Sequence, residues 1–381
     1  MAEVLTLAAD RVVSASGDWS PGWLTIADGR IRDCGSGITP DAGRDRGSAR
    51  LERLSGTLIP GLVDIHAHGA LGVDFGAADA LAARRVAAHH ASLGTTTLLA
   101  SLASAPIGAL ERGIRTLRPL VEDGTLAGIH LEGAYLSPRR RGAHDLGMLR
   151  SPDLGEMRRL VGAGGGAVRM VTLAPELDGA EVVVRWLAAN GVTVALGHSE
   201  CDADTARAAF GWGARVVTHL FNGMAPLHHR AAGLVGAALV DQRVTLELIL
   251  DGQHVGPEAV EIARRTAPGR IALVSDAMSA TGCPDGAFTI AGSPVRVRDG
   301  VATTADGSSL AGSTSTLGVG LAILLSTTGV TLREAVAATS TTAAQAIGLP
   351  HSGIHPGAAA DLLLLGDGGV TRVMRRGEWL R

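Results

Sequence analysis

Short apolar runs alternate with longer stretches rich in alanine, arginine and glutamate from about residue 57 onward. Each run has the length of a buried strand, and each intervening stretch is long enough for a helix. The runs predict eight strands: Thr57–Ile65, Thr95–Ser101, Leu126–Leu131, Val168–Leu173, Val192–Leu196, Arg215–Thr218, Val244–Leu250 and Arg270–Ser275. Eight repeats of strand and helix favour an α/β fold of the (β/α)8 TIM-barrel type over an open sheet.

The stretches between these strands predict the surrounding helices. The expected helices are Ala77–Ser92, Pro106–Val121, Asp153–Val161, Ala180–Asn190, Ala203–Phe210 and Pro257–Thr266. After the eighth strand, Phe288–Asp306 predicts a hairpin insertion, and further helices are expected at Thr316–Thr328 and Leu332–Ile347.

Both ends of the chain have a different pattern, in which short β-like pieces are separated by Gly, Asp and Pro. These pieces are Val4–Leu7, Trp23–Ile26 and Arg30–Cys34 near the start, and Ala360–Leu365, Val370–Arg376 and Glu378–Leu380 near the end. We therefore expect a small β-sandwich domain built from both termini, residues 1–56 and 356–381, beside a barrel domain of residues 57–355.

Composition narrows the functional classes. Hydrophobic residues make up 46% of the chain and the formal net charge is −3, so neither disorder nor a basic surface for nucleic acid or an anionic membrane is indicated. No apolar run reaches the ~18 residues of a membrane span, and the acidic Glu3 and Asp10 argue against a secretory signal peptide. The three cysteines are widely spaced, which fits a reducing cytoplasm.

The chain contains no lysine, so all 34 basic residues are arginine. This excludes Schiff-base and pyridoxal-phosphate mechanisms and the lysine of a P-loop. It also excludes any metal site that is bridged by a carboxylated lysine.

Polar residues gather where the predicted strands end, which is the edge at which barrel enzymes build their active sites. They are Asp64, His66 and His68 at the end of the first strand, His130 and Glu132 at the third, His198 after the fifth, His219 after the sixth and Asp276 after the eighth. Imidazole and carboxylate groups together suit Zn²⁺, Fe²⁺, Ni²⁺ or Co²⁺. The pattern therefore predicts a metal site at this edge.

The same segments carry a family resemblance. The matching runs are Pro60–Gly69, His130–Gly133, Gly197–Ser199, Thr218–Met224, Asp251–Val255, Asp276–Gly282, Leu310–Thr314 and Pro356–Leu362. With a His-x-His pair after the first strand and an aspartate after the eighth, the chain resembles the amidohydrolase superfamily. Its Thr-His-Leu-Phe-Asn and Asp-Ala-Met-Ser-Ala-Thr-Gly segments make it more closely similar to N-acetylglucosamine-6-phosphate deacetylases.

The resemblance implies deacetylation of N-acetyl-D-glucosamine 6-phosphate in amino-sugar metabolism, with one or two divalent metal ions per subunit. The implied ligands are Glu132, His198 and His219 for one ion, and His66 and His68 for a second. Zn²⁺ is expected first, with Fe, Co, Ni, Mn or Cd as alternatives. Asp276 is expected to carry a proton from water to the leaving amine, and His144 to support the developing oxyanion.

The resemblance also implies the substrate contacts. They are Ala143, His144, Asn222, Gly223, Arg230, His254, Leu310, Ala311 and Gly312. Arg230 suits the phosphate end because a guanidinium binds phosphate through two parallel hydrogen bonds. Members of this family are typically dimers, so we expect a homodimer in which Arg230 reaches the site of the neighbouring subunit.

Two departures from the family pattern concern pocket shape. This chain has Ala134 and Tyr135 where the family usually has Pro and Phe, and Gly223 where it often has Ala. Two alternatives stay open: a deacetylase for the galacto epimer, and a non-catalytic assembly protein related to amidohydrolases. We expect the run Arg139–Arg141 to be a solvated loop.

Overall fold

The computed structural model describes residues 4–37, 49–290, 292–349 and 353–380. Within these residues, eight parallel strands stand side by side in chain order and form a nearly closed barrel. They are β6 (Leu62–Asp64), β9 (Thr95–Ala103), β10 (Gly128–Glu132), β11 (Val168–Leu173), β12 (Thr193–Leu196), β13 (Val216–Val217), β14 (Thr245–Ile249) and β15 (Ile271–Val274). The predicted TIM-type barrel is confirmed.

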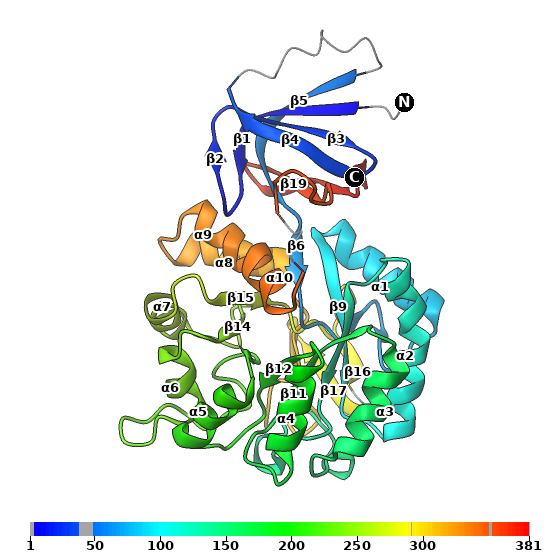
Figure 1. The fold of residues 1–381 in the computed structure, drawn as a ribbon, viewed down its shortest axis with the longest axis vertical. Coiled ribbons are helices and arrows are strands. Elements are labelled where there is room, and N and C mark those ends of the chain that lie inside the picture. Colours follow the sequence, from blue (N-terminus) through cyan, green and yellow to red (C-terminus); the bar gives the residue numbers. More distant parts are fainter. Residues whose placement is uncertain (1–3, 38–48, 291, 350–352, 381) are drawn as a thin grey trace.

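Helices surround this barrel (Figure 1). They are α1 (Ala80–Ser92), α2 (Ile107–Glu122), α3 (Leu154–Gly164), α4 (Ala180–Ala189), α5 (Ala203–Trp212), α6 (Gly233–Val240), α7 (Pro257–Thr266) and α8 (Leu317–Thr327). Helix α6 was not predicted, because it is apolar on nearly all sides and so gives no helical period. Among the described residues, no helix combines the length and the apolarity needed to cross a bilayer.

The layer of the barrel interior next to α10 is apolar and is closed. Inward-facing side chains such as Val63, Leu99 and Met170 form one cluster with residues of α10 (Thr342–Ala346). Thr193, the first residue of β12, donates a hydrogen bond to the Ala346 carbonyl at 2.9 Å. Helix α10 therefore closes the amino end of the barrel, and the opposite end is free for a site.

The expected helix Leu332–Ile347 is interrupted. It consists of α9 (Leu332–Val336), a π-helical turn (Ala337–Thr341) and α10. The interruption was invisible in the periodicity of the sequence.

The two termini build one connected sheet. Its strands are β1 (Val4–Val13), β2 (Asp18–Trp19), β3 (Gly22–Ala27), β4 (Arg30–Ser36), β5 (Ala49–Pro60), β19 (Leu362–Gly366), β20 (Gly369–Arg375) and β21 (Glu378–Trp379). Ile31 of β4 donates from its backbone to the Ala358 carbonyl just before β19, so the sheet curves back on itself. Leu24, Leu58 and Met374 lie in the core that it encloses. The expected sandwich is thus one sheet folded around its own core, and residues 38–48 of the expected domain lie outside the described residues.

The single strand expected at Thr57–Ile65 is wrong. Strand β5 ends at Pro60 in the terminal sheet, and only Leu62–Asp64 join the barrel. The change occurs at Gly61, where a Cβ atom would lie 2.1 Å from the Thr96 hydroxyl oxygen. Only glycine allows this close approach, so the sheets change at residue 61 and not at residue 57.

The predicted hairpin insertion is present as a three-stranded antiparallel sheet. It consists of β16 (Gly286–Ile290), β17 (Ser293–Arg298) and β18 (Val301–Thr304). Shorter elements near the same end are the hairpin β7 (Gly69–Ala70) and β8 (Val73–Asp74), and the 3₁₀ turns Pro138–Arg140 and Leu146–Met148. Met278 and Ala311 lie in the apolar cluster under the insertion, and Ala143 packs against it.

Candidate active site

The first and last barrel strands meet just beyond their ends. The Asp276 amide donates to the His66 carbonyl at 2.9 Å, and the His68 amide donates to the Ala277 carbonyl at 2.7 Å. The buried Asp64 carboxylate spans the gap, accepting from the Ser275 amide at 3.3 Å. Closure of the barrel therefore brings the His-x-His pair directly to Asp276.

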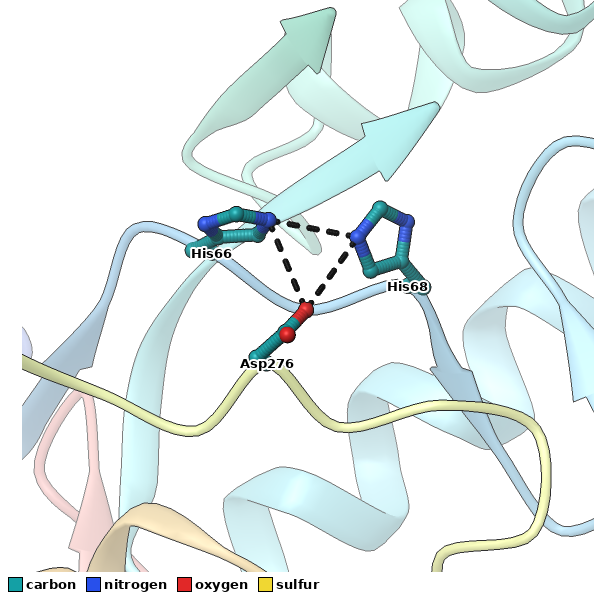
Figure 2. Close-up of side chains that lie close together, drawn as sticks. All are labelled: His66, His68 and Asp276. Atoms are coloured by element: carbon teal, nitrogen blue, oxygen red, sulfur yellow. Dashed lines mark hydrogen bonds and ion pairs between the residues drawn. The ribbon is translucent and has the colours of Figure 1, made fainter. Parts of the chain in front are cut away.

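Three buried side chains converge at this point. The Nε2 atoms of His66 and His68 lie 3.2 Å apart, and Oδ1 of Asp276 lies 3.5 Å from the first and 3.3 Å from the second. Figure 2 shows the three side chains pointing toward one another. Their donor atoms have the spacing of a metal-ligand group.

A second group lies beside the first. Oε1 of Glu132 is 3.2 Å from Nε2 of both His198 and His219, and these two nitrogens are 3.1 Å apart. Glu132 also reaches the first group, since its Oε2 lies 3.0 Å from Nε2 of His68. The glutamate therefore stands between two candidate metal positions.

Three of these residues have left-handed backbones. The φ angles of His198, His219 and Asp276 are +48°, +29° and +48°. Such conformations cost on the order of 1–3 kcal/mol for residues other than glycine, and they cluster at functional sites. The strand-to-loop turns that aim these side chains into the site thus store strain.

The hydrogen bonds of the second group fit a bound cation. Nδ1 of His198 lies 2.7 Å from the Arg140 carbonyl, and Nδ1 of His219 lies 3.2 Å from the Asn222 carbonyl. Because a carbonyl only accepts, both Nδ1 atoms carry the proton, and both Nε2 lone pairs face each other beside the Glu132 carboxylate. Three converging acceptors repel one another unless a positive charge lies among them.

The first group also favours positive charge. Burial alone would lower the pKa of His68, but hydrogen bonds to the Asp276 and Glu132 carboxylates outweigh it and raise the pKa to about 9. The field of these carboxylates therefore attracts a cation. We conclude that both groups fit divalent metal ions.

A cavity of about 450 Å³ opens onto the two groups. Most of the expected contacts line it: His68, Glu132, Ala143, His144, His198, His219, Asn222, Gly223, His254, Asp276, Leu310 and Gly312. His66 lies deeper and is fully buried. Two expected contacts are not in this wall: the Ala311 side chain is buried under the insertion, and Arg230 is exposed.

Arg230 lies on the long connection between β13 and α6, which extends outward in Figure 1. Its guanidinium contacts the neighbouring His229 ring at 2.7 Å. In the described single chain this arginine is therefore not part of its own cavity.

His144 is held as a neutral hydrogen-bond donor. Its Nδ1 accepts from the Ser104 amide at 3.3 Å, so the proton is on Nε2, which faces Glu132 Oε2 at 3.4 Å. Burial lowers the pKa of His144 to about 4. The ring therefore presents an N–H to the cavity at neutral pH.

His254 is held by a buried carboxylate. Asp251 Oδ2 accepts from His254 Nδ1 at 2.8 Å and from the Ser313 hydroxyl at 2.8 Å. Burial opposes protonation of His254, but the bond to Asp251 outweighs it and raises the pKa. Asp251 therefore fixes the orientation of a ring that lines the cavity.

The expectation of a solvated loop at Arg139–Arg141 is wrong in part. All three residues line the cavity, Arg140 pairs with Glu200, and Arg141 donates to the His144 carbonyl at 2.8 Å. The segment thus positions the His144 and His198 rings.

Sequence reasoning missed several residues that hold the site. Glu247 bonds to His66, Ser104 orients His144, and Asp251 orients His254. Glu247 had a usable signal, because a carboxylate within an otherwise apolar strand requires a buried partner.

A parallel (β/α)8 barrel with histidines and carboxylates converging at the carboxyl ends of its strands has the architecture of a metal-dependent barrel enzyme. The model of the amidohydrolase family matches residues 57–380. Together with the relatives described next, this match shows that the chain belongs to the amidohydrolase family and, within it, to the N-acetylglucosamine-6-phosphate deacetylases.

Relatives of known identity cover most of the chain. An N-acetylgalactosamine-6-phosphate deacetylase of Escherichia coli O157:H7 is 38% identical, over 81% of this chain and 80% of its own. The N-acetylglucosamine-6-phosphate deacetylase of Homo sapiens is 35% identical over the same shares. A solved structure of the Mycobacterium smegmatis N-acetyl-D-glucosamine-6-phosphate deacetylase matches this chain with a TM-score of 0.94 and 41% identity, covering 99% of both chains. That structure is of an aspartate-to-alanine mutant in complex with N-acetyl-D-glucosamine-6-phosphate.

Proposed function

We propose that this enzyme hydrolyses N-acetyl-D-glucosamine 6-phosphate to D-glucosamine 6-phosphate and acetate. The observation that carries the proposal is the convergence of Glu132, four histidines and Asp276 at the floor of a cavity whose wall includes His254. The relative of known structure in complex with this sugar phosphate supports the substrate class. The complete set of donor groups argues against a non-catalytic assembly protein.

Glu132, His198 and His219 would hold one divalent cation, and His66, His68 and Asp276 surround the position of a second. Zn²⁺ is our first choice because it suits imidazole and carboxylate ligands, with Fe, Co, Ni, Mn and Cd as alternatives. A cation there supplies positive charge that polarises the amide carbonyl and acidifies the attacking water.

The chain's own residues carry the proton and the developing charge. In our proposal, Asp276 accepts the proton of the attacking water and delivers it to the amine nitrogen, which leaves poorly unless it is protonated. The Nε2–H of His144 donates to the oxygen of the tetrahedral intermediate. The Ser104 amide keeps that proton on Nε2 throughout.

The phosphate end would lie against Asn222, Gly223 and His254. We propose that Arg230 completes this end from the neighbouring subunit of a homodimer. Its exposure, and its position outside the cavity of its own chain, support such a role. We place the activity in the cytoplasm, since Cys34, Cys201 and Cys283 are all free thiols.

The test is acetate release from N-acetylglucosamine 6-phosphate, N-acetylgalactosamine 6-phosphate and unphosphorylated N-acetylglucosamine, before and after metal removal by a chelator. The galacto epimer is included because the Escherichia coli relative is named an N-acetylgalactosamine-6-phosphate deacetylase. We expect the gluco epimer to be preferred, and activity to be lost on chelation and restored by Zn²⁺. Glu132→Gln should be inactive, whereas Glu261→Gln, a surface control on α7, should match wild type. Preference for the galacto epimer, or activity without metal, would overturn the proposal.

A further inference from the structure

Glu247 is a buried carboxylate that faces the site from outside both metal-ligand groups. It is the acidic residue of β14, where its neighbours Leu246 and Leu248 are apolar and fully buried, and it is itself fully buried. Its Oε2 lies 3.1 Å from Nδ1 of His66 and 3.2 Å from the backbone nitrogen of His219. A buried carboxylate is costly unless such bonds compensate it.

The contact with His66 fixes the proton of that ring. The His219 amide can only donate, so Glu247 Oε2 accepts a hydrogen bond from it. The same oxygen accepts a second hydrogen bond from His66, so the proton of that ring is on Nδ1. Nε2 of His66 is then a bare lone pair, and it points at His68 Nε2 and Asp276 Oδ1. Only in this tautomer does Nε2 of His66 offer an electron pair to a cation beside His68 and Asp276.

Among the four histidines of the two groups, His66 is held differently from its neighbours. His198 and His219 place their Nδ1–H on neutral backbone carbonyls, and Nδ1 of His68 has no hydrogen-bond partner among the described residues. His66 alone donates to a carboxylate. A charged acceptor makes a stronger bond and raises the basicity of the opposite nitrogen.

Glu247 also connects the two groups physically. One of its oxygen atoms holds the ring of His66 and the backbone of His219, whose φ of +29° needs such an anchor. The His66 and His219 rings stack, with centroids 5.6 Å apart and planes inclined by 26°. Glu247 contacts the ring of His66 but only the backbone of His219. Its effect is therefore strongest at the position beside His68 and Asp276.

We infer that Glu247 is a positioning residue that determines whether this enzyme holds a second divalent cation at His66, His68 and Asp276. It acts through His66 by fixing the tautomer and adding negative charge behind the ring. The inference rests on the metal assignment in the proposed function.

The test measures metal content, not turnover. Purified wild type, Glu247→Gln and Glu247→Leu are stripped of metal and equilibrated with graded free Zn²⁺, and bound zinc per chain is determined by elemental analysis. Loss of such an outer partner weakens metal binding by about 10–100-fold. We expect Glu247→Gln, whose amide oxygen still accepts both bonds, to weaken the second zinc by about tenfold, and Glu247→Leu by about a hundredfold. In Glu247→Gln, which keeps an acceptor for the His219 amide, the first zinc should bind as in wild type.

Two further measurements keep the result decisive. Glu176→Gln is the matched control, because Glu176 accepts from the Ser199 hydroxyl and the Glu200 amide beside His198 and makes no contact with His66. It should leave the second zinc unchanged. In a His66→Asn background, Glu247→Gln should have no further effect on the second zinc, since its route of action is gone.

Nitrogen NMR of labelled histidine in the zinc-loaded wild type reads the tautomer directly and needs no variant to fold. A proton on Nδ1 of His66 is expected, and a proton on Nε2 overturns the inference. Equal weakening of both zinc ions in folded Glu247→Gln, or wild-type affinity for two zinc ions in Glu247→Leu, also overturns it. These outcomes are independent of the substrate: an enzyme that binds two zinc ions as expected but releases no acetate contradicts only the proposed function.

Discussion

Replacing His144 tests whether a neutral imidazole stabilises the oxyanion in this enzyme. The perturbation is His144→Ala, which removes the single N–H that faces the cavity beside Glu132. His144→Gln retains an amide donor at a shifted position. Ser104→Ala removes the hydroxyl that contacts Nδ1 at 2.9 Å and keeps the backbone N–H that fixes the tautomer.

The expected magnitude follows from the geometry. One pre-oriented neutral donor to an oxyanion is worth about 10²–10³ in kcat, or about 2.7–4 kcal/mol of transition-state stabilisation. His144→Ala should therefore lower kcat by that factor with little change in KM, and His144→Gln should recover part of the loss. Ser104→Ala forfeits one net hydrogen bond of about 1 kcal/mol, which is about fivefold in kcat.

The assay is steady-state acetate release from N-acetylglucosamine 6-phosphate, with zinc content measured on the same samples. A His144→Ala enzyme within threefold of wild-type kcat would refute the oxyanion role. A rise in KM at unchanged kcat would assign His144 to substrate binding alone. Loss of zinc from His144→Ala would show instead that the ring supports Glu132.

Three further predictions concern other parts of the molecule. Asp276→Asn should lower kcat by about 10²–10⁴ while zinc at Glu132 is retained, and kcat within tenfold of wild type would contradict the proton-transfer role. Arg230→Ala should lower kcat/KM for the phosphorylated sugar by about 10–100-fold, from the 1.5–3 kcal/mol of a charge-assisted bond, and leave unphosphorylated N-acetylglucosamine unaffected; equal losses on both would make Arg230 structural. His90 is buried, and burial lowers its pKa to about 4, below the 6.5 of the unfolded chain. The contribution of the neutral ring to the free energy of unfolding is therefore complete above pH 6.5 and is lost as the pH falls toward 4. Between pH 7 and pH 5 the loss lowers the free energy of unfolding by about 2 kcal/mol. In urea unfolding of the metal-free protein, His90→Gln should show a decrease over this range that is smaller by that amount, and an unchanged decrease would contradict the prediction.

The barrel and the converging residues could be predicted from the sequence because both leave local traces. Each parallel strand is a compact apolar run, and polar residues such as His198, His219 and Asp276 stand immediately after such runs. Parallel strands bring their carboxyl ends to one edge, so chain position alone indicates convergence. The conclusion needed no knowledge of side-chain contacts.

The misplaced features depend on information that a local pattern lacks. Thr57–Ile65 is one apolar run, and its division between two sheets depends on Thr96 and Asp361, which approach Gly61 only in the folded chain. The supporting role of Glu247 depends on His66, which lies far away in the sequence. Helix α6 is buried on nearly every side, so the contrast between faces that reveals a helix is missing.

The sharing of one sheet by both termini sets an order of events during synthesis. On one edge of β5, residues Thr57–Pro60 pair with Leu362–Leu365 of β19. At about 5–20 residues per second, the roughly 300 intervening residues take about 15–60 s to translate, and the free edge of β5 stays open for that time. Open strand edges recruit other chains, so nascent polypeptides on one messenger are exposed to mispairing at this edge. A chain that stops short of Leu362 retains every barrel strand but lacks β19, so the edge of β5 stays unpaired and open to association with other chains.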